Sequence, residues 1–191
     1  MINRPLFEGT VIRLTALDAK EDGATLAAWT QDSRYISLSE GTPPHPLSPA
    51  QAEKVLDELL KDANEKRNSF WFGVRTLDDS ELLGVIGLEW MDWSNGTAYM
   101  IVSMKDLAEY GRSSTEEALA LMQHYVFLEL QMHRVGLTVP AYNEGLIGVL
   151  HKMMFVEEVR QREALFRYGR RWDNIRFGVL AADWKGGIDD E

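Results

Sequence analysis

The residues Gly111 to Glu117, Gly-Arg-Ser-Ser-Thr-Glu-Glu, stand at the start of a long helical pattern and could bind an anion. The first N–H groups of a helix have no intrahelical acceptor and attract negative charge, so a phosphate could dock here. Ser114 and Glu117 also fit the Ser-x-x-Glu capping box, in which side chains occupy the same donors. Because Gly111 alone is a weak signal for a phosphate loop, local sequence favours the cap.

Other kinds of chemistry are limited by composition. The chain has no cysteine, which excludes disulfides, thiolate nucleophiles and cysteine metal sites, and its four histidines show no paired ligand spacing. We therefore expect no metal. The formal net charge of -10 argues against nucleic acid as a partner, because duplex binding needs cationic neutralisation of phosphates. An acidic surface permits a cationic partner, although ordinary solubility explains it equally well.

Length and composition indicate one domain. The 191 residues, 45% of them hydrophobic and 26% charged, suit a single globular core. The first ten residues hold no apolar leader segment, and no apolar run is long enough to cross a bilayer. We expect a cytoplasmic protein with no membrane partner, in which residues 1–185 form the domain and 186–191 a flexible acidic tail.

Hydrophobic periodicity predicts alternating strands and helices. Asp18 or Asp22 can cap the first helix, and Ser48, Pro49 and Gln51 form the clearest helix start in the chain. Strands are expected at 10–17, 69–76, 81–90, 96–104, 134–139, 156–168 and 176–183, and helices at 18–29, 48–62, 115–130 and 144–153. The last two strands would be separated by Gly169 to Asp173.

This order predicts a mixed α/β or α+β layer fold. Three successive strands joined by short turns form an antiparallel meander. One parallel step leads from strand 96–104 across helix 115–130 to strand 134–139. Strand ends and a helix N-terminus meet at that step, so the functional site is expected there.

Several segments carry a family resemblance: FEGTVIRLTALD, LLGVIGLEWMDW, the turn and helix from Tyr110, and EEVRQREALFRYGRRWDNIRFGVLAADW. Together they resemble the GNAT superfamily of acetyl-coenzyme A dependent N-acetyltransferases, in the branch of the ribosomal-protein N-terminal acetyltransferases. The resemblance spans Leu6 to Trp184. It implies a GNAT fold, with a mostly antiparallel seven-stranded sheet flanked by about four helices.

The resemblance also implies acetyl-CoA as co-substrate and a set of residues that bind it. In the family the cofactor diphosphate rests on backbone N–H groups before the long helix, and the pantetheine arm lies along the neighbouring strand. Transferred to this sequence, the implied cofactor-binding residues are Val102, Ser103, Gly111, Arg112, Ser113, Ser114, Thr115 and Asn143.

The chain departs from the family pattern at several positions, among them Gly145 and Leu146 after Asn143. Ser113 and Thr115 replace loop glycines, and a β-branched threonine tolerates positive φ poorly. Arg112 and the two hydroxyls could offset the change by contacting phosphate oxygens. Leu150 replaces a tyrosine that protonates the leaving thiolate, so a water would have to serve, and Met154 replaces a glycine before Phe155.

An N-acetyltransferase needs a base, because amines are largely protonated at neutral pH. Glu89 is the expected catalytic base, with Asp92 as second choice, although strand alternation equally allows Glu89 to point into solvent. Tyr99, Ser103 and Tyr110 are polar residues near the expected cleft. The three tryptophans that could line an acceptor pocket, or simply close a core, are Trp90, Trp93 and Trp172.

Two functions remain open at this stage. The first is transfer of an acetyl or related acyl group from coenzyme A to a primary amine, on a small molecule or a protein N-terminus, by direct attack in a ternary complex. The second is a degenerate GNAT-fold binding protein with weak or no coenzyme A binding, which the changes at Ser113, Thr115, Leu150 and Met154 favour. The protein could be a monomer or a homodimer.

Overall fold

A seven-stranded sheet organises the fold. The computed structural model describes residues 5–39, 43–184 and 186. The strands are β1 Ile12–Thr15, β2 Phe70–Thr76, β3 Leu82–Asp92, β4 Thr97–Met104, β5 Arg134–Pro140, β6 Val156–Arg167 and β7 Arg170–Leu180. They lie in the order β1-β2-β3-β4-β5-β7-β6, and β4 and β5 pair in parallel while the other neighbours are antiparallel. The predicted sheet and its parallel step are confirmed.

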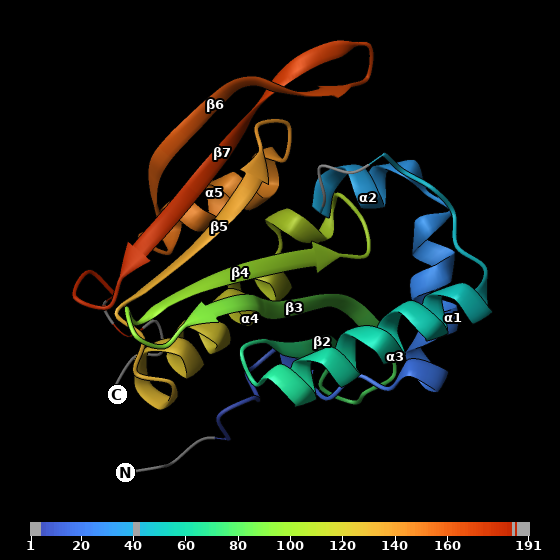
Figure 1. Ribbon diagram of the computed structural model, residues 1–191, viewed down its shortest axis with the longest axis horizontal. Coiled ribbons are helices and arrows are strands. Elements are labelled where there is room, and N and C mark those ends of the chain that lie inside the picture. The colour runs from blue at the N-terminus through green and yellow to red at the C-terminus, as the bar shows by residue number, and fades with distance from the viewer. Residues whose placement is uncertain (1–4, 40–42, 185, 187–191) are drawn as a thin grey trace.

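Helices cover both faces of this sheet (Figure 1). The α-helices in the described residues are α1 Ala19–Thr30, α2 Ser33–Ser39, α3 Pro49–Lys66, α4 Ser113–His124 and α5 Glu144–Lys152. Helices α4 and α5 lie behind the sheet in this view, and α3 lies in front of β2 and β3, packed against α1. Within the described part of the chain, no helix has both the length and the apolar character needed to span a membrane.

Helix α2 was not predicted, which is why the structure has five α-helices rather than about four. Its sequence, Ser-Arg-Tyr-Ile-Ser-Leu-Ser, has weak helix propensity and is too short to be stable alone. Tertiary contacts hold it instead. Tyr142 donates to the carbonyl of Ser37, and the Asn143 amide donates to the carbonyl of Leu38 at 3.4 Å.

The turn between the last two strands is shorter than predicted. Strand β7 begins at Arg170, so only Tyr168 and Gly169 connect it to β6, and the prediction of a connection from Gly169 to Asp173 was wrong. Both turn residues have positive φ, 54° and 75°. Such a two-residue turn matches the twist of an antiparallel hairpin.

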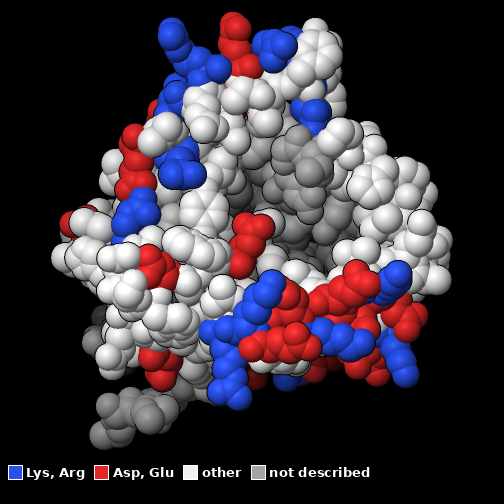
Figure 2. Space-filling model, in the orientation of Figure 1, with Lys and Arg blue, Asp and Glu red and all other residues white. Residues whose placement is uncertain are grey.

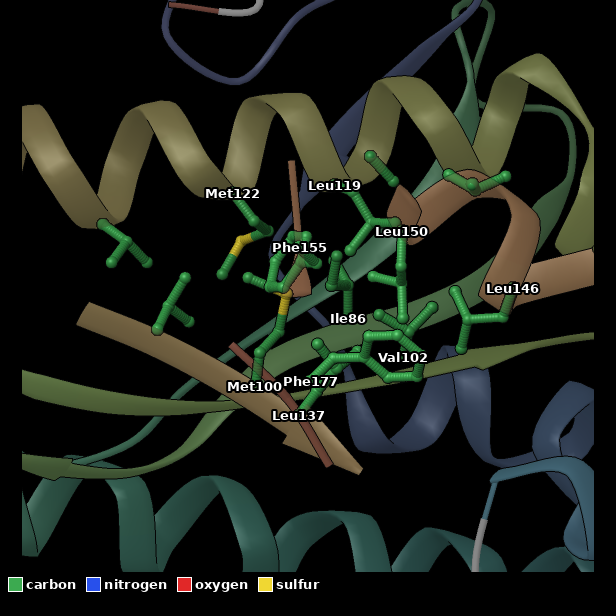
Figure 3. Packing of buried hydrophobic residues seen from close by; sticks show 14 of the residues in the cluster. Ile86, Met100, Val102, Leu119, Met122, Leu137, Leu146, Leu150, Phe155 and Phe177 are labelled. Carbon is green, nitrogen blue, oxygen red and sulfur yellow. The ribbon is translucent and has the colours of Figure 1, made fainter. Parts of the chain in front are cut away.

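The two faces of the sheet are packed differently. Between the sheet and helices α4 and α5 lies a continuous core of buried side chains, among them Met100, Val102, Leu119, Leu150 and Phe177 (Figure 3). On the opposite face the buried apolar cluster consists of Leu17, Leu56 and Leu82 with partly buried neighbours from α1 and α3. The second face therefore has room for a cavity.

Candidate active site

Strands β4 and β5 separate soon after they meet, which leaves one edge of β4 open. Their parallel pairing covers Thr97–Tyr99 and Arg134–Gly136, after which the strands diverge (Figure 1). The hydroxyl of Tyr110 shows which backbone groups of β4 face the split, because it accepts from the N–H of Met104 at 3.2 Å and contacts the carbonyl of Val102 at 3.5 Å. Alternate residues of a strand point their backbone groups to the same side, so the N–H of Met100 points toward β5 at the end of the paired segment and the N–H of Val102 faces the split beyond it.

Val102 and Ser103 consequently face different surroundings. The side chain of Val102 is buried in the core behind the sheet, and its backbone lies on the open edge. Ser103 alternates with it, so its backbone faces β3, and its side chain lines a cavity in front of the sheet. Of these two expected cofactor-binding residues, Val102 is the one whose backbone lies on the open edge.

A β-bulge in β3 directs Glu89 into that cavity. Leu88 pairs with Met100 and Trp90 pairs with Tyr99, so Glu89 is the extra residue on β3. A bulge re-aims a side chain because two residues oppose one on the partner strand. Glu89 lines the cavity, and its side chain is also exposed to solvent. The sequence left these two orientations as alternatives, and in the structure both hold.

The cavity lies between the sheet and helices α1, α2 and α3. It has a volume of about 700 Å³, and the face that contains it is hollowed at its centre (Figure 2). Ser103 and Ile101 of β4 line it together with Glu89. The cavity therefore reaches β4, the strand with the open edge toward β5. Glu89 and Ser103, both identified from the sequence, line the same cavity.

Helix α4 starts without a side-chain cap, so the predicted capping box was wrong. Among the described residues no side chain caps its first turn. The hydroxyl of Ser114 donates instead to the carboxylate of Glu109 at 2.7 Å. The first-turn N–H groups of Ser113, Ser114 and Thr115 therefore remain available to an anion.

The side chain of Glu117 bonds to residues 10–12, at and just before the start of β1. Its carboxylate accepts from the N–H groups of Val11 and Ile12 and from the hydroxyl of Thr10, each at 2.8 Å. Gly9 makes room for it, because a Cβ there would meet the carboxylate carbon at 2.1 Å. Burial raises the pKa of the Glu117 carboxyl, but the N–H donors of residues 10–12 outweigh that effect and hold the pKa below its ordinary value.

A buried carboxylate, Glu109, organises the loop before α4. Its side chain is 3% exposed and is paired with Arg112, whose side chain is 60% exposed. The hydroxyl of Thr115 donates to the Glu109 carbonyl at 2.7 Å, and Asp106 accepts from the Glu109 N–H at 3.0 Å. These contacts hold the loop against the first turn of α4. Sequence analysis did not identify Glu109, since a lone glutamate before a helix resembles a solvated charge.

The loss of loop glycines causes no backbone strain. Among the described residues, none between Gly111 and Thr115 has positive φ, and Ser113 and Thr115 lie within regular α4. The concern that Thr115 would be forced into an unfavourable dihedral was therefore wrong. Gly145 is closely packed against this loop: a Cβ on Gly145 would lie 3.2 Å from the Gly111 nitrogen. The first turn of α5 thus rests against this loop.

Asn143 is buried away from solvent with its amide engaged at both ends. Its oxygen accepts from the Leu146 N–H at 3.2 Å and so caps α5, while its nitrogen donates to the Leu38 carbonyl. It joins α5 to α2. The resemblance implies that this asparagine contacts pantetheine or bridges the strands, and cofactor contact by Asn143 stays a prediction.

Several other expected residues lie outside the cavity. Asp92 accepts from the backbone and side chains of Ser94 and Asn95 in the β3–β4 turn, which lowers its pKa and makes it a poor base. The tryptophans Trp90 and Trp93 are exposed, and Trp172 stacks beneath Arg170. Trp71, which sequence analysis did not consider, is the tryptophan that lines the cavity.

Comparison with known proteins identifies the family. The family model described as "Acetyltransferase (GNAT) domain" matches residues 12–156, which contain β1 to β5, α4 and the loop before it. The chain belongs to the GNAT acetyltransferase family and is an acyltransferase by that membership. The family uses acetyl-CoA.

The individual relatives share low sequence identity with this chain. The chain is 27% identical over 129 residues to the SPbeta prophage-derived uncharacterized N-acetyltransferase YokL of Bacillus subtilis strain 168, covering 67% of this chain and 71% of that protein. It superposes with a TM-score of 0.75 on a spermidine N-acetyltransferase from Vibrio cholerae in complex with CoA and spermine, at 20% identity, covering 90% and 96% of the chains. For RimL, a ribosomal L7/L12 α-N-protein acetyltransferase in complex with coenzyme A, the TM-score is 0.76 at 15% identity, covering 92% and 96%. These two structures show a shared fold.

Proposed function

We propose that this protein transfers an acetyl group, or a related acyl group, from coenzyme A to a primary amine. The observation that carries the proposal is the combination of an uncapped α4 start, an open β4 edge and a carboxylate-bearing cavity on the same strand. The structural neighbours named for spermidine and ribosomal-protein acetylation are consistent with an amine acceptor.

The residues around the split fit coenzyme A. The free N–H groups of Ser113, Ser114 and Thr115 would hold its diphosphate, with Arg112 at the rim. The backbone of Val102 would pair with the pantetheine arm, as an added strand pairs with a sheet edge. When bound, coenzyme A supplies an acyl group activated as a thioester. The N–H of Val102, which lies beyond the paired part of β4, would be a preorganised donor for the acyl oxygen.

Glu89 is proposed as the base that takes a proton from the acceptor ammonium. It lines the cavity and belongs to the bulge opposite Met100 and Tyr99. We expect Glu89→Gln to lower kcat by about a hundredfold, because a positioned base typically contributes that much, and to leave coenzyme A affinity unchanged. Steady-state kinetics and calorimetry measure the two effects.

Asp92→Asn is the matched control for Glu89→Gln, since it makes the same chemical change three residues away outside the cavity. Its turnover should stay within about twofold of wild type, a surface substitution being normally that mild. Equal losses in both variants, or none in Glu89→Gln, would remove Glu89 from the mechanism.

Tyr99 is proposed to hold the proton that the leaving thiolate needs. Leu150 cannot donate one and is buried in the core behind the sheet. The Tyr99 hydroxyl lies against the Thr138 hydroxyl across the point where β4 and β5 separate. We expect Tyr99→Phe to lower turnover by about tenfold at unchanged coenzyme A affinity. A matching loss in Thr138→Val would indicate that the pair acts as a unit; normal turnover in Tyr99→Phe would assign the step to water.

The competing function is a binding module without transfer. The buried Glu109 carboxylate favours it, because a negative charge lies directly beneath the proposed diphosphate site. Titration of acetyl-CoA followed by calorimetry separates the two functions. Heat that saturates below millimolar ligand, together with thiol release when an amine is added, is the outcome expected of the enzyme. Absence of heat at millimolar ligand would leave only the binding module.

A further inference from the structure

The cavity in front of the sheet is apolar along most of its walls. Its aliphatic and aromatic lining comes from α1, α2, the segment before α3, α3 itself and β2, and includes Leu26, Ile36, Leu47, Val55, Leu59 and Trp71. A volume of about 700 Å³ lies within the usual range for small-molecule sites. An acceptor that fills this space must bring apolar surface to it, since desolvating a polar group without a partner is costly.

Among the described lining residues, Glu89 is the carboxylate without an ion pair. Two carboxylates line it among the described residues, Glu89 and Asp62. The Asp62 carboxylate already pairs with the Lys66 ammonium at 2.6 Å. Glu89 forms no ion pair within the described residues. Neither lysine nor arginine occurs among the described lining residues, so a cation that enters is attracted to Glu89.

Polar residues line the cavity from several elements, and three of them, Asp62, Ser69 and Glu89, belong to connected parts of the fold. Ser69 lines it and directly precedes Phe70, whose register partner is Leu88, so Ser69 lies beside Glu89. Asp62 is on the last turns of α3, whose chain leads through Arg67 back to Ser69. Most of the remaining lining is aliphatic, from α1, α2 and α3, with Thr30, Tyr35 and His45 as the polar residues of that part. An ammonium at Glu89 would therefore extend its carbon skeleton into apolar surroundings.

We propose that the acceptor is a primary amine with a single positive charge and an apolar body, in place of a polyamine. This inference rests on the proposed function and specifies its substrate. A second ammonium on the aliphatic walls would have no polar partner there, and the carboxylate of Asp62, which is 54% exposed, already pairs with Lys66. The same chemistry is carried by free arylalkylamines and by peptide N-termini whose first side chain is large and apolar.

Binding to the protein without cofactor tests the inference separately from transfer. Calorimetric titration with phenethylamine, hexylamine and spermidine should give at least about tenfold tighter binding for the two apolar amines, a difference expected from burying several methylene groups. Tetrapeptides beginning with Phe or Asp distinguish a peptide source from a free amine. Tighter binding of spermidine, or no binding of either apolar amine, would overturn the inference.

The two proposals can fail independently. If phenethylamine binds but no thiol is released when acetyl-CoA is added, the proposed transfer fails and the inferred acceptor class stands. If spermidine is acetylated and the apolar amines neither bind nor react, the transfer stands and the acceptor class is wrong.

A charge placed on the apolar wall provides a second test. Val55 lines the cavity and is 54% exposed, so Val55→Glu should leave the fold intact. We expect phenethylamine binding to weaken by about fivefold or more and spermidine binding to strengthen, because the wall then offers a partner for a second ammonium. Val159→Glu, the same change at a residue 46% exposed on β6 and outside the lining, should alter neither. Unchanged affinities in Val55→Glu would overturn the inference.

Discussion

Helices α3 and α4 begin with closely related residues but have opposite surroundings. At α3, Ser48 accepts from the Gln51 N–H at 3.3 Å and Gln51 accepts from the Ser48 N–H at 2.9 Å, with Pro49 in the first turn. At α4, Ser114 and Glu117 have the same spacing and both side chains bond elsewhere. The first helix start is closed by its own residues, and the second stays open.

The difference follows from competition between partners. Ser114 has a buried carboxylate, Glu109, within reach, and a hydroxyl bonds more strongly to a charged acceptor than a backbone amide bonds to a hydroxyl. Glu117 finds three adjacent N–H groups near Ile12 that need an acceptor. No comparable partner competes for Ser48, which is exposed. A local capping pattern is therefore decisive only where tertiary partners are lacking.

Giving α4 the Ser-Pro start of α3 should have the largest effect. In Arg112→Ser/Ser113→Pro, the new hydroxyl would occupy one first-turn amide and proline would remove another. Arg112 has φ −91° and ψ 166°, an extended conformation that suits a residue before proline. We expect coenzyme A to bind about thirtyfold more weakly, roughly 2 kcal/mol, measured by calorimetry.

Arg112→Ala is the control for that double variant, because it removes the guanidinium and its pair with Glu109 without closing the amides. It should weaken coenzyme A binding by about threefold through loss of an exposed charge, and it should also lower thermal stability, because the buried Glu109 carboxylate loses its partner. Wild-type affinity in the double variant, at the thermal stability of Arg112→Ala, would show that the α4 amides do not bind the diphosphate.

Glu117→Gln tests how much the contact between α4 and residues 10–12 contributes to the stability of the protein. Loss of a charged acceptor shared by several N–H groups should cost about 2 kcal/mol of unfolding free energy, measured by urea denaturation. Because the folded pKa of Glu117 is lowered, its contribution is present above the ordinary pKa of 4.5 and is lost as the pH falls below it. The variant should therefore lose less stability than wild type between neutral pH and pH values under 4.5. Parallel pH profiles for the two proteins would contradict this role.

Ser48→Ala should have the smallest effect. Removal of an exposed N-cap typically costs about 1 kcal/mol of stability. Coenzyme A affinity should not change, because α3 presents its amides to its own side chains. A loss of coenzyme A affinity in this variant would mean that helix stability in general, rather than the open start of α4, controls binding.

Much of the fold could be predicted from local pattern. The meander, the parallel step and the start of α3 at Ser48 are each encoded in adjacent residues, and all are confirmed. Helix α2 could not be predicted, because its stability comes from Tyr142 and Asn143, more than 100 positions away. The capping prediction at Ser114 failed for a related reason, since Glu117 bonds to residues 10–12.

The candidate site was only partly predictable. Glu89, Ser103 and Gly111 were identified from sequence and lie at the cavity or the start of α4. The bulge that aims Glu89 depends on the register between two strands, which no single segment specifies. The apolar lining of the cavity comes from α1, α2, α3 with the segment before it, and strands β2, β3 and β4, so its chemistry becomes visible only when the chain is folded.

Amide chemical shifts in 15N-labelled protein test the central claim most directly. Titration with coenzyme A should shift the backbone N–H signals of Ser113, Ser114 and Thr115 until they saturate, and leave the N–H signal of the capped Gln51 in place. Signals at the start of α4 that do not move while coenzyme A is bound, or that move no more than Gln51, would contradict the account.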